Sequence, residues 1–508
     1  MRFQSKSVFW LRQASRHLMR VLTLLMAVIA TIWLVRGFEA RNMPELAIWH
    51  TYSLKNEFHA RDYPNGITFP QYQQLEVRLD AELDENIYLQ IGADNLGQFN
   101  RYDKSSRVYA GPTGRKWNRS FEIDIANPVG GILLLHGASD SPYSIRAISE
   151  VFAKQGFYVL ALRLPGNGTI PSGLKQAKLD DWLAITRMGV EHVSEKIGQG
   201  IPLYLGGYSV GAALILDYTL DALTDASLTV PEKLFLYSPA IGITKFARFS
   251  GWDVALSTIP LFEKFAWMSI QPEYDPYKYN SFAKNAGHTT YLLTQGLRKK
   301  IQANRELSEW QSLPPIIAFQ SLVDATVHTG TLVSELCLHL PANESELVLF
   351  DINRANDLHH FIVDNERAML HQLQEGQATQ FSFTLVTNDS GESRDVQAHT
   401  RVVGKVDFSA EDLHSRWPSG VYSLSHVAIP FEKTDPWYGG ETAFDGEQVL
   451  SIGAIAPRGE QGLLTVPSAQ FMRLRHNPFF DYVAERTRDF CTVCRSEQAD
   501  GEASQLPD

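Results

Sequence analysis

The hydrophobic and polar positions between residues 121 and 352 alternate between two kinds of pattern. Short apolar runs are typical of strands buried on both faces of a parallel sheet, and stretches with helical spacing of apolar residues separate them. Strands alternating with helices predict an α/β fold, a mostly parallel sheet with helices on both faces. The predicted strands are 131–135, 157–162, 203–205, 233–237, 316–319 and 346–352, and the predicted helices are 147–155, 183–197 and 212–220.

Other patterns flank and interrupt this core. Residues 71–90 have the spacing of an amphipathic helix, and the polar stretch 94–116 predicts a loop. Residues 239–312 are rich in aromatic residues and lysine without a strand rhythm, which predicts a helical cap over the active face or a helical subdomain with no gating role. Turn residues near 388–391 predict an inserted hairpin at 379–407. The chain therefore divides into an N-terminal extension at 37–120, core parts at 121–238 and 313–430, the cap at 239–312, and a C-terminal extension with a mobile tail at 431–508.

The first 36 residues predict a single-pass membrane anchor. Five basic residues and no acidic residue fall within residues 1–20, and residues 21–35 carry no charge. As a helix this run is about 22 Å long, so we extend the predicted transmembrane signal anchor to residues 18–36 to approach the ~30 Å core of a bilayer. The positive-inside rule makes residues 1–17 a cytoplasmic basic tail. The body then lies across the membrane, which in a bacterium is the periplasmic side of the inner membrane.

Two alternatives to the anchor follow from the same residues. A cleaved signal peptide has the right order of charge, but its best cleavage site places bulky Phe38 where a small residue is preferred. A buried core helix would not explain the five preceding basic residues. The uncleaved anchor therefore explains the pattern best.

Composition narrows the class of protein. The chain has 508 residues, 44% hydrophobic and 20% charged, which is typical of a folded core with additions. Its net charge of −11 argues against a nucleic-acid partner. Cys491 and Cys494 form a CxxC pair that predicts a local disulfide or two free thiols rather than a redox or metal site, because no second pair accompanies it. No metal or organic cofactor is implied.

A pentapeptide and its surroundings predict a nucleophile. Gly207-Tyr208-Ser209-Val210-Gly211 follows the predicted strand 203–205 and precedes a predicted helix. A G-x-S-x-G sequence in that position makes a turn so sharp that its flanking residues must be small, and it lifts the serine hydroxyl above the edge of the sheet. Ser209 is therefore the candidate nucleophile.

A serine nucleophile needs backbone donors for the oxyanion that forms when it attacks a carbonyl. The N–H of Val210, the residue after the nucleophile, is one candidate. The second should come from the loop after an earlier strand, and the Ala138 N–H in the loop after 131–135 fits that position. We interpret His136 in the same loop as a brace for the loop rather than as a base.

The acid and the base should follow later strands. Asp324 lies in the loop after the predicted strand 316–319, and we expect it to orient the base. His426 ends a strand-like run between small and apolar neighbours, which predicts that it is the base. His359 and His360, at the start of a predicted helix, are the alternative bases. Either choice keeps the order Ser, Asp, His along the chain.

On these motifs the chain resembles the α/β-hydrolase superfamily, in particular its monoacylglycerol lipase, carboxylesterase and serine-aminopeptidase-like hydrolases. The resemblance covers about 121–238 and 314–327, and it implies an α/β-hydrolase fold and serine hydrolysis. The ending of the chain around 425–439 also resembles bacterial membrane-anchored relatives, which supports His426. Asn167 stands where relatives often have histidine, and Ala138 and Ser139 replace a bulky aromatic residue. The motifs that carry the resemblance are Leu135-His136-Gly137, Asp140-Ser141-Pro142, Arg163 to Thr169, the G-x-S-x-G turn and Asp324 to Val327.

The leading hypothesis is hydrolysis of a lipid-like carboxylic ester, such as a lysophospholipid or monoacylglycerol. A peptidase, an amidase or an acyltransferase of the same fold is the alternative within enzymes. A non-catalytic hydrolase-like binding module is the alternative outside them, although its expected signature, a missing nucleophile, is not found in this sequence. The expected partners are a small-molecule or lipid ester and, through the N-terminal helix, the membrane. No pattern in the sequence indicates an oligomeric state.

Overall fold

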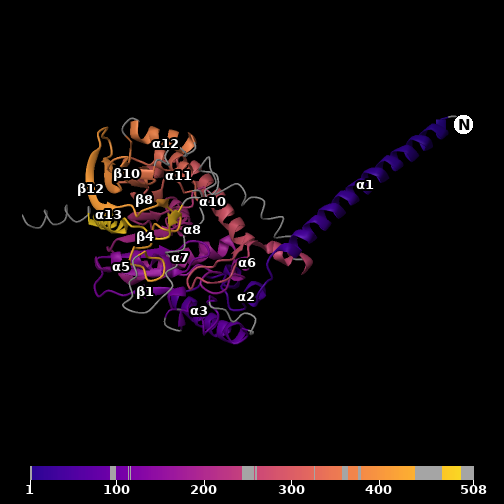
Figure 1. The fold of residues 1–508 in the computed structure, drawn as a ribbon, viewed down its shortest axis with the longest axis horizontal. Coiled ribbons are helices and arrows are strands. Elements are labelled where there is room, and N and C mark those ends of the chain that lie inside the picture. Colours follow the sequence, from indigo (N-terminus) through magenta and orange to yellow (C-terminus); the bar gives the residue numbers. More distant parts are fainter. Residues whose placement is uncertain are drawn as a thin grey trace, which may run out of the picture.

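The structure is a computed structural model that describes residues 3–91, 99–111, 114, 116–242, 257, 260–324, 326–356, 364–375, 379–440 and 472–492. A sheet of ten strands lies at its centre, in the order β1-β3-β2-β4-β5-β8-β9-β10-β11-β12 (Figure 1). The strands from β3 to β10 are parallel, and β1, β11 and β12 are antiparallel to their neighbours. The strands are β1 Phe121–Ile123, β2 Gly130–Leu135, β3 Phe157–Leu162, β4 Leu203–Tyr208, β5 Lys233–Tyr237, β8 Ile316–Ser321, β9 Glu346–Phe350, β10 Ser382–Asn388, β11 Asp395–Arg401 and β12 Ser409–Arg416.

Helices cover both faces of this sheet, as the alternation of strands and helices predicts. Leu133 and Leu135 of β2 point into one core with α7 and α8, whereas Ile132 and Leu134 point into a second core with α5 and α13. Successive residues of a strand face opposite sides, so uninterrupted apolar runs serve both cores. The helices are α1 Phe3–Asn42, α2 Ile48–Thr51, α3 Phe69–Leu83, α5 Arg146–Ala153, α6 Gly173–Gln176, α7 Leu179–Ile197, α8 Val210–Ala222, α10 Lys284–Asn304, α11 Thr329–Glu335, α12 Asp364–Glu375 and α13 Phe480–Thr492.

The segment expected to be a helical cap is partly core. Leu293, Leu297 and Ile301 of α10 are buried in the same core as α7 and α8. The parallel strands β5 and β8 are neighbours, and a helix on the face of the sheet is the usual way to connect such a pair. A two-stranded ribbon, β6 Trp267–Ser269 with β7 Phe282–Ala283, precedes α10. These strands are too short to produce a readable alternation in the sequence. Residues 243–256 and 258–259 lie outside the described residues.

The predicted hairpin at 379–407 is present as β10 and β11, but it is not an insertion beside the core. β10 pairs in parallel with β9, and β12 extends the same sheet beyond β11. The hairpin therefore continues the central sheet. After it, β13 Val421–Leu424 pairs in parallel with β14 Met472–Leu474 in a separate small sheet.

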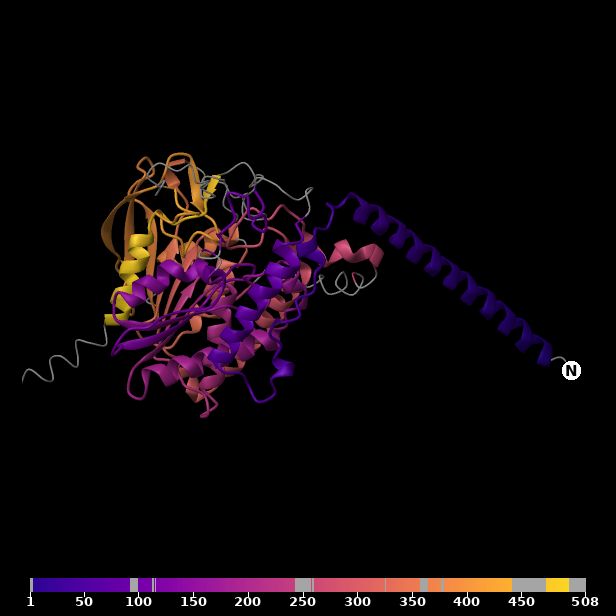
Figure 2. The same cartoon turned by 90° about the horizontal axis from the view of Figure 1, so that it is seen from below.

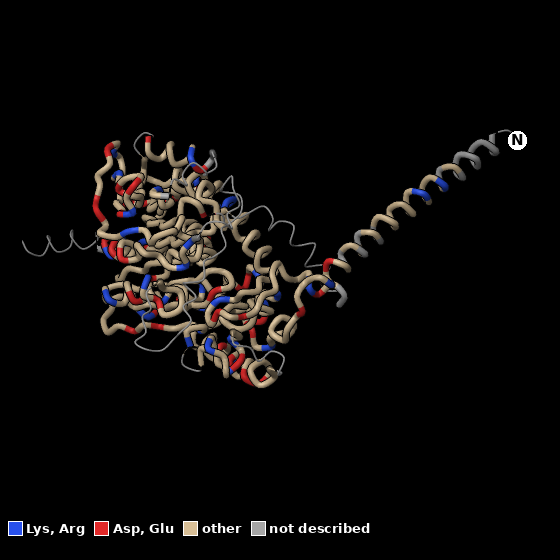
Figure 3. Tube along the Cα trace, viewed as in Figure 1, with Lys and Arg blue, Asp and Glu red and all other residues tan. Residues whose placement is uncertain are grey.

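The N-terminal helix α1 projects from the body (Figures 1 and 2). Near its C-terminal end it packs against the 3-10 helix η7 Pro260–Ala266, where the Trp33 and Phe262 rings meet edge to face at 5.1 Å. Acidic and basic residues are interspersed over the body, whereas uncharged residues predominate along α1 beyond its basic residues (Figure 3). Counted over the described residues, no helix combines the length and apolarity needed to cross a membrane.

The N-terminal extension packs on the core through α3, which is followed by a π-helical turn, η2 Asp84–Tyr88, close to the predicted helix 71–90. Its Glu57 and Glu76 both pair with the buried Arg163, at 3.0 Å each. Arg163 directly follows β3, and Glu57 also accepts the Gly166 N–H at 2.9 Å. The extension therefore fixes the loop after β3, at the carboxyl edge of the sheet where ligands of such folds bind.

Candidate active site

Ser209 lies at the turn between β4 and α8 in a strained conformation. Its φ of 55° and ψ of −113° fall in a region that costs a non-glycine residue about 1–3 kcal/mol. A Cβ on Gly207 would overlap the backbone of Gly211 and Ala212, and a Cβ on Gly211 would overlap the carbonyl of Leu135. The two glycines are therefore required by close packing, and the turn presents the serine hydroxyl at the carboxyl edge of the sheet.

His426 connects Ser209 to Asp324. Its Nε2 lies 3.0 Å from the Ser209 Oγ, and its Nδ1 lies 2.7 Å from the Asp324 Oδ2. All three side chains are buried. Because a carboxylate only accepts hydrogen bonds, the His426 Nδ1 carries the proton and donates a hydrogen bond to Asp324. The Nε2 is then free to accept a hydrogen bond from the serine hydroxyl. This is the arrangement that activates a serine as a nucleophile.

Each member of this chain of hydrogen bonds comes from a different strand. Ser209 follows β4, Asp324 follows β8 and His426 follows β13. The Asp324 Oδ1 accepts the N–H groups of Thr326 and Val327 at 3.0 and 3.1 Å, and its Oδ2 accepts from the Gln320 Nε2 at 3.0 Å. These bonds hold the carboxylate in one orientation. The alternative bases, His359 and His360, lie outside the described residues.

Arg473 is a buried residue that sequence reasoning missed. Its guanidinium donates to the carbonyls of Val323 and Leu424, at 2.9 and 2.8 Å. It therefore ties the loop that carries Asp324 to the end of β13, just before His426. No motif could reveal it, because β14 brings Arg473 to the site from about fifty residues beyond His426 in the chain.

The two candidate oxyanion donors belong to loops that touch. Val210 begins α8, and Ala138 lies in the loop after β2, which we define as the oxyanion loop, residues 136–141. A Cβ on Gly211 would reach within 2.8 Å of the His136 carbonyl, and one on Gly137 would reach within 2.9 Å of the Tyr208 ring. The structure thus brings the oxyanion loop against the serine turn, as the sequence predicts.

His136 braces the oxyanion loop. Its Nδ1 donates to the Gly137 carbonyl at 2.7 Å, and its Nε2 accepts the Leu164 N–H at 3.0 Å from the loop after β3. Complete burial lowers the pKa of His136 to about 3, so the ring is neutral near pH 7. Asn167, the departure from the family pattern, closes its own turn by donating to the carbonyls of Leu164 and Pro165.

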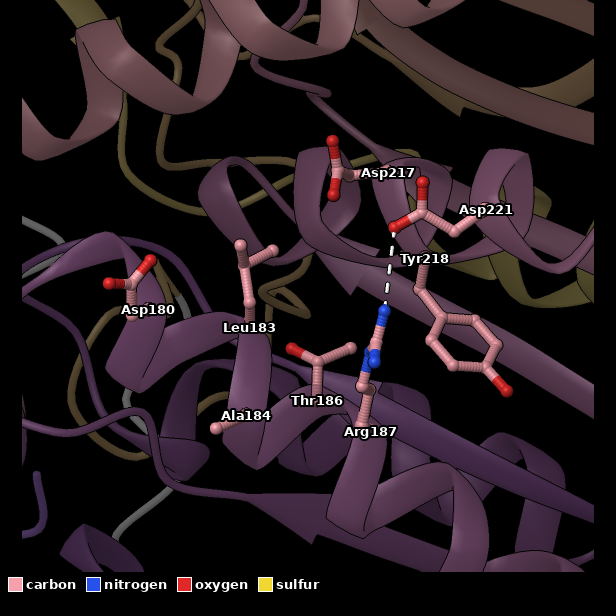
Figure 4. A pocket seen from close by; sticks show the side chains of 8 residues that line it. All are labelled: Asp180, Leu183, Ala184, Thr186, Arg187, Asp217, Tyr218 and Asp221. Carbon is pink, nitrogen blue, oxygen red and sulfur yellow. Dashed lines mark ion pairs between the residues drawn. The ribbon is translucent and has the colours of Figure 1, made fainter. Parts of the chain in front are cut away.

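A second hollow lies away from these residues, between α7 and α8 (Figure 4). It has a volume of about 260 Å³. Two of its carboxylates pair with Lys300, whose Nζ lies 2.8 Å from carboxylate oxygens of both Asp217 and Asp221. Arg187 also pairs with Asp221, at 3.8 Å. The residues lining it are Asp180, Leu183, Ala184, Thr186, Arg187, Asp217, Tyr218 and Asp221.

No metal-binding group is found among the described residues. No three histidine, cysteine, aspartate or glutamate side chains lie together there in a way that could hold an ion. Cys491 is buried near the end of α13, and Cys494 lies outside the described residues. The expectation of a local disulfide or two free thiols in this CxxC sequence therefore stays a prediction.

A family model and a curated protein both match part of this chain. Residues 126–298 match the family model described as Serine aminopeptidase, S33. The thermostable monoacylglycerol lipase of Bacillus sp. (strain H-257) is 31% identical over 111 residues, which are 22% of this chain and 43% of the lipase. The chain thus matches less than half the length of that relative.

The solved structures that match this chain are more distant in sequence. A soluble variant of the monoglyceride lipase of Saccharomyces cerevisiae is 16% identical with a TM-score of 0.36, covering 46% of this chain and 82% of that one. The monoacylglycerol lipase of Paleococcus ferrophilus is 17% identical with a TM-score of 0.33, covering 46% and 89%.

Proposed function

Because the chain belongs to the α/β-hydrolase superfamily, we propose that it is a serine hydrolase that cleaves a carboxylic ester through an acyl-enzyme on Ser209. The observation that carries this proposal is the chain of hydrogen bonds from Asp324 through His426 to Ser209. A strained serine in that chain is poised for nucleophilic attack, and no structural role requires such an arrangement.

The reaction follows from the position of each proton. The Ser209 Oγ attacks the carbonyl carbon of the ester while its proton passes to the His426 Nε2. The N–H groups of Ala138 and Val210 receive the oxyanion. The protonated His426 then gives its proton to the leaving alcohol, and the C–O bond of the ester breaks. A water molecule then attacks the acyl carbon of the acyl-enzyme and gives a proton to His426. The bond between that carbon and the Ser209 Oγ breaks, the proton passes from His426 to the Oγ, and the carboxylic acid is released. Asp324 stabilises the imidazolium throughout.

A lipid-like ester is the proposed substrate. The curated relative is a monoacylglycerol lipase, and a group of aromatic side chains borders the oxyanion loop. Tyr143, which directly follows that loop, stacks on Tyr277 with ring centroids 3.8 Å apart. These rings are buried in a core cluster of their own, so the proposal of a lipid-like ester rests on the curated relative. The group consists of Tyr143, Tyr277, Phe431 and Tyr438, with Trp117 and Trp437 packed against it.

A peptidase is the second candidate, because the matching family model is described as a serine aminopeptidase. The same nucleophile, base and oxyanion donors would cleave an amide. An acyltransferase would differ only in passing the acyl group to an alcohol instead of water. Comparing rates on matched p-nitrophenyl esters and p-nitroanilides, with analysis of the acyl product, separates the three activities.

Labelling with a fluorophosphonate tests the proposal directly. The full-length chain in detergent should form a covalent adduct that mass spectrometry locates at Ser209. Ser209→Ala should not react, and His426→Ala should react much more slowly because the base is gone. If folded wild-type protein never labels Ser209, the hydrolase proposal fails and a binding module becomes the better explanation. If His426→Ala labels at the wild-type rate, the base is His359 or His360.

We also propose that α1 anchors the protein in a membrane, with the body on the periplasmic side of a bacterial inner membrane. The uncharged run 21–35 and the basic residues before it support this proposal. Leu22, Leu24, Leu25 and Val28 of α1 are exposed, which would be costly in water. The chain should sediment with membranes after carbonate washing, and external protease should digest the body in spheroplasts. Release by carbonate would contradict the anchor.

A further inference from the structure

The loop between β6 and β7 is built as a rigid unit. We define residues 273–281 as the strap. The Asp275 Oδ1 accepts the N–H groups of Tyr277 and Lys278, both at 3.0 Å. The buried Glu273 carboxylate accepts those of Asn280 and Ser281, at 3.1 and 2.8 Å. Since four backbone N–H groups of the strap donate to its own carboxylates, its side chains project from a fixed frame.

The strap is also fastened from both ends of the chain. The Arg101 N–H of the N-terminal extension donates to the Glu273 carbonyl at 2.8 Å, and its guanidinium donates to the Lys278 carbonyl at 3.3 Å. From the C-terminal extension, the Tyr438 hydroxyl donates to the Asp275 Oδ1 at 2.6 Å. These contacts leave the strap little freedom relative to the core.

The strap contacts the oxyanion loop at two consecutive residues, Ser139 and Asp140. The Lys278 Nζ lies 3.0 Å from the Asp140 Oδ2, and the Tyr279 N–H donates to the Ser139 carbonyl at 2.8 Å. Ala138, the candidate oxyanion donor, immediately precedes both gripped residues. Ser139 has a φ of 63°, a left-handed conformation that a non-glycine residue keeps only when its surroundings hold it.

The Asp140 carboxylate lies close to Gly137 in the oxyanion loop. A Cβ on Gly137 would lie 3.1 Å from the Asp140 Oδ2. Burial raises the pKa of the Asp140 carboxyl, and the Lys278 ammonium opposes that shift. Asp140 therefore belongs to the loop that carries Ala138, and Lys278 is its charged partner.

We propose that Lys278 is a positioning residue for the oxyanion hole: its ammonium holds Asp140 and so aims the Ala138 N–H at the developing oxyanion. This inference rests on the proposed serine hydrolase function. The lysine does not touch the substrate. It acts by keeping the oxyanion loop, which has an energetically unfavourable residue at Ser139, in the one arrangement in which the donor is useful.

The chain contains a matched control. Lys278 is 24% exposed and its partner Asp140 is 5% exposed. Lys300 is 33% exposed and its partner Asp217 is 5% exposed, with the two atoms 2.8 Å apart. Both are lysines paired with a buried aspartate, but Lys300 lies in α10 and pairs with the far part of α8. Lys300→Met therefore reports what losing such a pair does without touching the oxyanion loop.

The experiment compares Lys278→Met, Lys278→Arg and Lys300→Met in the full-length chain, using a soluble p-nitrophenyl ester. We expect Lys278→Met to lower kcat about 10- to 100-fold with KM changed less than about threefold, because a displaced donor weakens only transition-state binding. Lys278→Arg should recover most of kcat. Lys300→Met should keep kcat within about twofold. The rate of fluorophosphonate labelling should fall in parallel with kcat.

The outcomes separate this inference from the hydrolase proposal. If wild-type protein labels Ser209 and Lys278→Met labels at the same rate, the positioning role is wrong while the hydrolase proposal stands. Equal losses of kcat in Lys278→Met and Lys300→Met would also overturn it, because they would indicate a general loss of stability. Should Lys278→Met fail to fold, Asp140→Asn, which keeps the shape of its side chain, is expected to show the same kcat loss. Wild-type kinetics in that variant would reject the role of the pair.

Discussion

Helix α8 carries buried polar groups at both ends, and the two ends differ in kind. At its N-terminal end stands Ser209, whose backbone is strained and whose hydroxyl meets a histidine delivered by another strand. Two to three turns further on, Asp217 and Asp221, both drawn in Figure 4, lie in a helical, unstrained stretch. Both pair with Lys300. This second cluster contains more charged groups than the serine turn, but Asp217, Asp221 and Lys300 form ion pairs with one another.

The difference teaches what distinguishes a site from a structural network. Ion pairs between helices hold those helices together, and their charged groups are already occupied by one another. At the serine turn, the structure instead maintains an unfavourable backbone conformation where a base is aligned with a hydroxyl. Strain together with convergence from separate strands is therefore the better indicator of chemistry than density of charge.

Removing the nucleophile should give the largest effect of all. Ser209→Ala should lower kcat/KM by about 10⁴-fold or more, because no acyl-enzyme can form. Hydrolysis of a short-chain p-nitrophenyl ester measures it. Alanine keeps the Cβ and therefore the strained backbone of the turn, so unfolding in urea should show stability close to that of wild type. A variant that keeps more than a tenth of the activity would place the reaction elsewhere.

Replacing the acid should have the next largest effect. Asp324→Asn keeps the size of the side chain but cannot stabilise the imidazolium, and its amide can favour the wrong tautomer of His426. We expect kcat to fall about 10³-fold, with KM changed little. Asp217→Asn, at the other part of α8, is the matched control and should keep kcat near that of wild type. Similar activities of the two variants would remove the distinction between the two regions.

The buried His136, next to the serine turn, should make the free energy of unfolding depend on pH. Burial lowers its pKa from 6.5 to about 3, so the unfolded chain binds a proton that the folded one does not between these values. Its contribution to stability is therefore present above pH 6.5 and is lost as the pH falls towards 3. Below pH 6.5 the free energy of unfolding should decrease by about 1.4 kcal/mol per pH unit on account of this group.

Urea unfolding of wild type and His136→Asn at pH 7.0 and at about pH 5.5 isolates that contribution. Asparagine cannot take up the proton, so the variant should lose less stability between the two pH values than wild type loses. His50, whose pKa burial lowers to about 4, is present in both proteins and cancels in the comparison. Parallel losses in the two proteins would show that His136 is not the group responsible.

The smallest effect on activity is expected in the charged cluster. Lys300→Met leaves Asp217 buried without its ammonium partner, which should lower the free energy of unfolding by about 1–3 kcal/mol. Catalysis should stay within about twofold, because neither the turn nor the oxyanion loop is touched. Urea unfolding and ester hydrolysis measure the two quantities on one sample. A large loss of kcat with unchanged stability would mean that the cluster communicates with Ser209.

Local patterns were enough for the centre of the fold and for the candidate nucleophile. Apolar runs marked the strands of the parallel part of the sheet up to β9, because such strands are buried on both faces and tolerate few charges. Asp324 was found because acids in this fold follow a strand. His426 was selected over His359 and His360 from its neighbours and from the resemblance of residues 425–439 to bacterial membrane-anchored relatives. The structure brings His426 to Ser209, while the other two histidines lie outside the described residues.

Other features had no local signal. The sequence reading placed 239–312 in a cap and 379–407 in an insertion, because periodicity shows that an element exists but not what it packs against. In the structure α10 is a core helix and β10 continues the sheet beside β9. The strap shows the same limit, since Lys278 looks like an ordinary surface lysine until folding places it on Asp140.

The amino-acid sequence by itself determined the elements and the reactive groups, because both depend on neighbours a few residues apart: burial on two faces makes a strand, and two glycines around a serine make the turn. Only the tertiary structure decided which distant groups meet. Arg473 joins the loops of Asp324 and His426 through contacts with residues 150 and 49 positions away in the chain. Lys278 holds the oxyanion loop through Asp140, 138 positions away. Such contacts are set by the packing of the whole sheet, and no short stretch of sequence contains them.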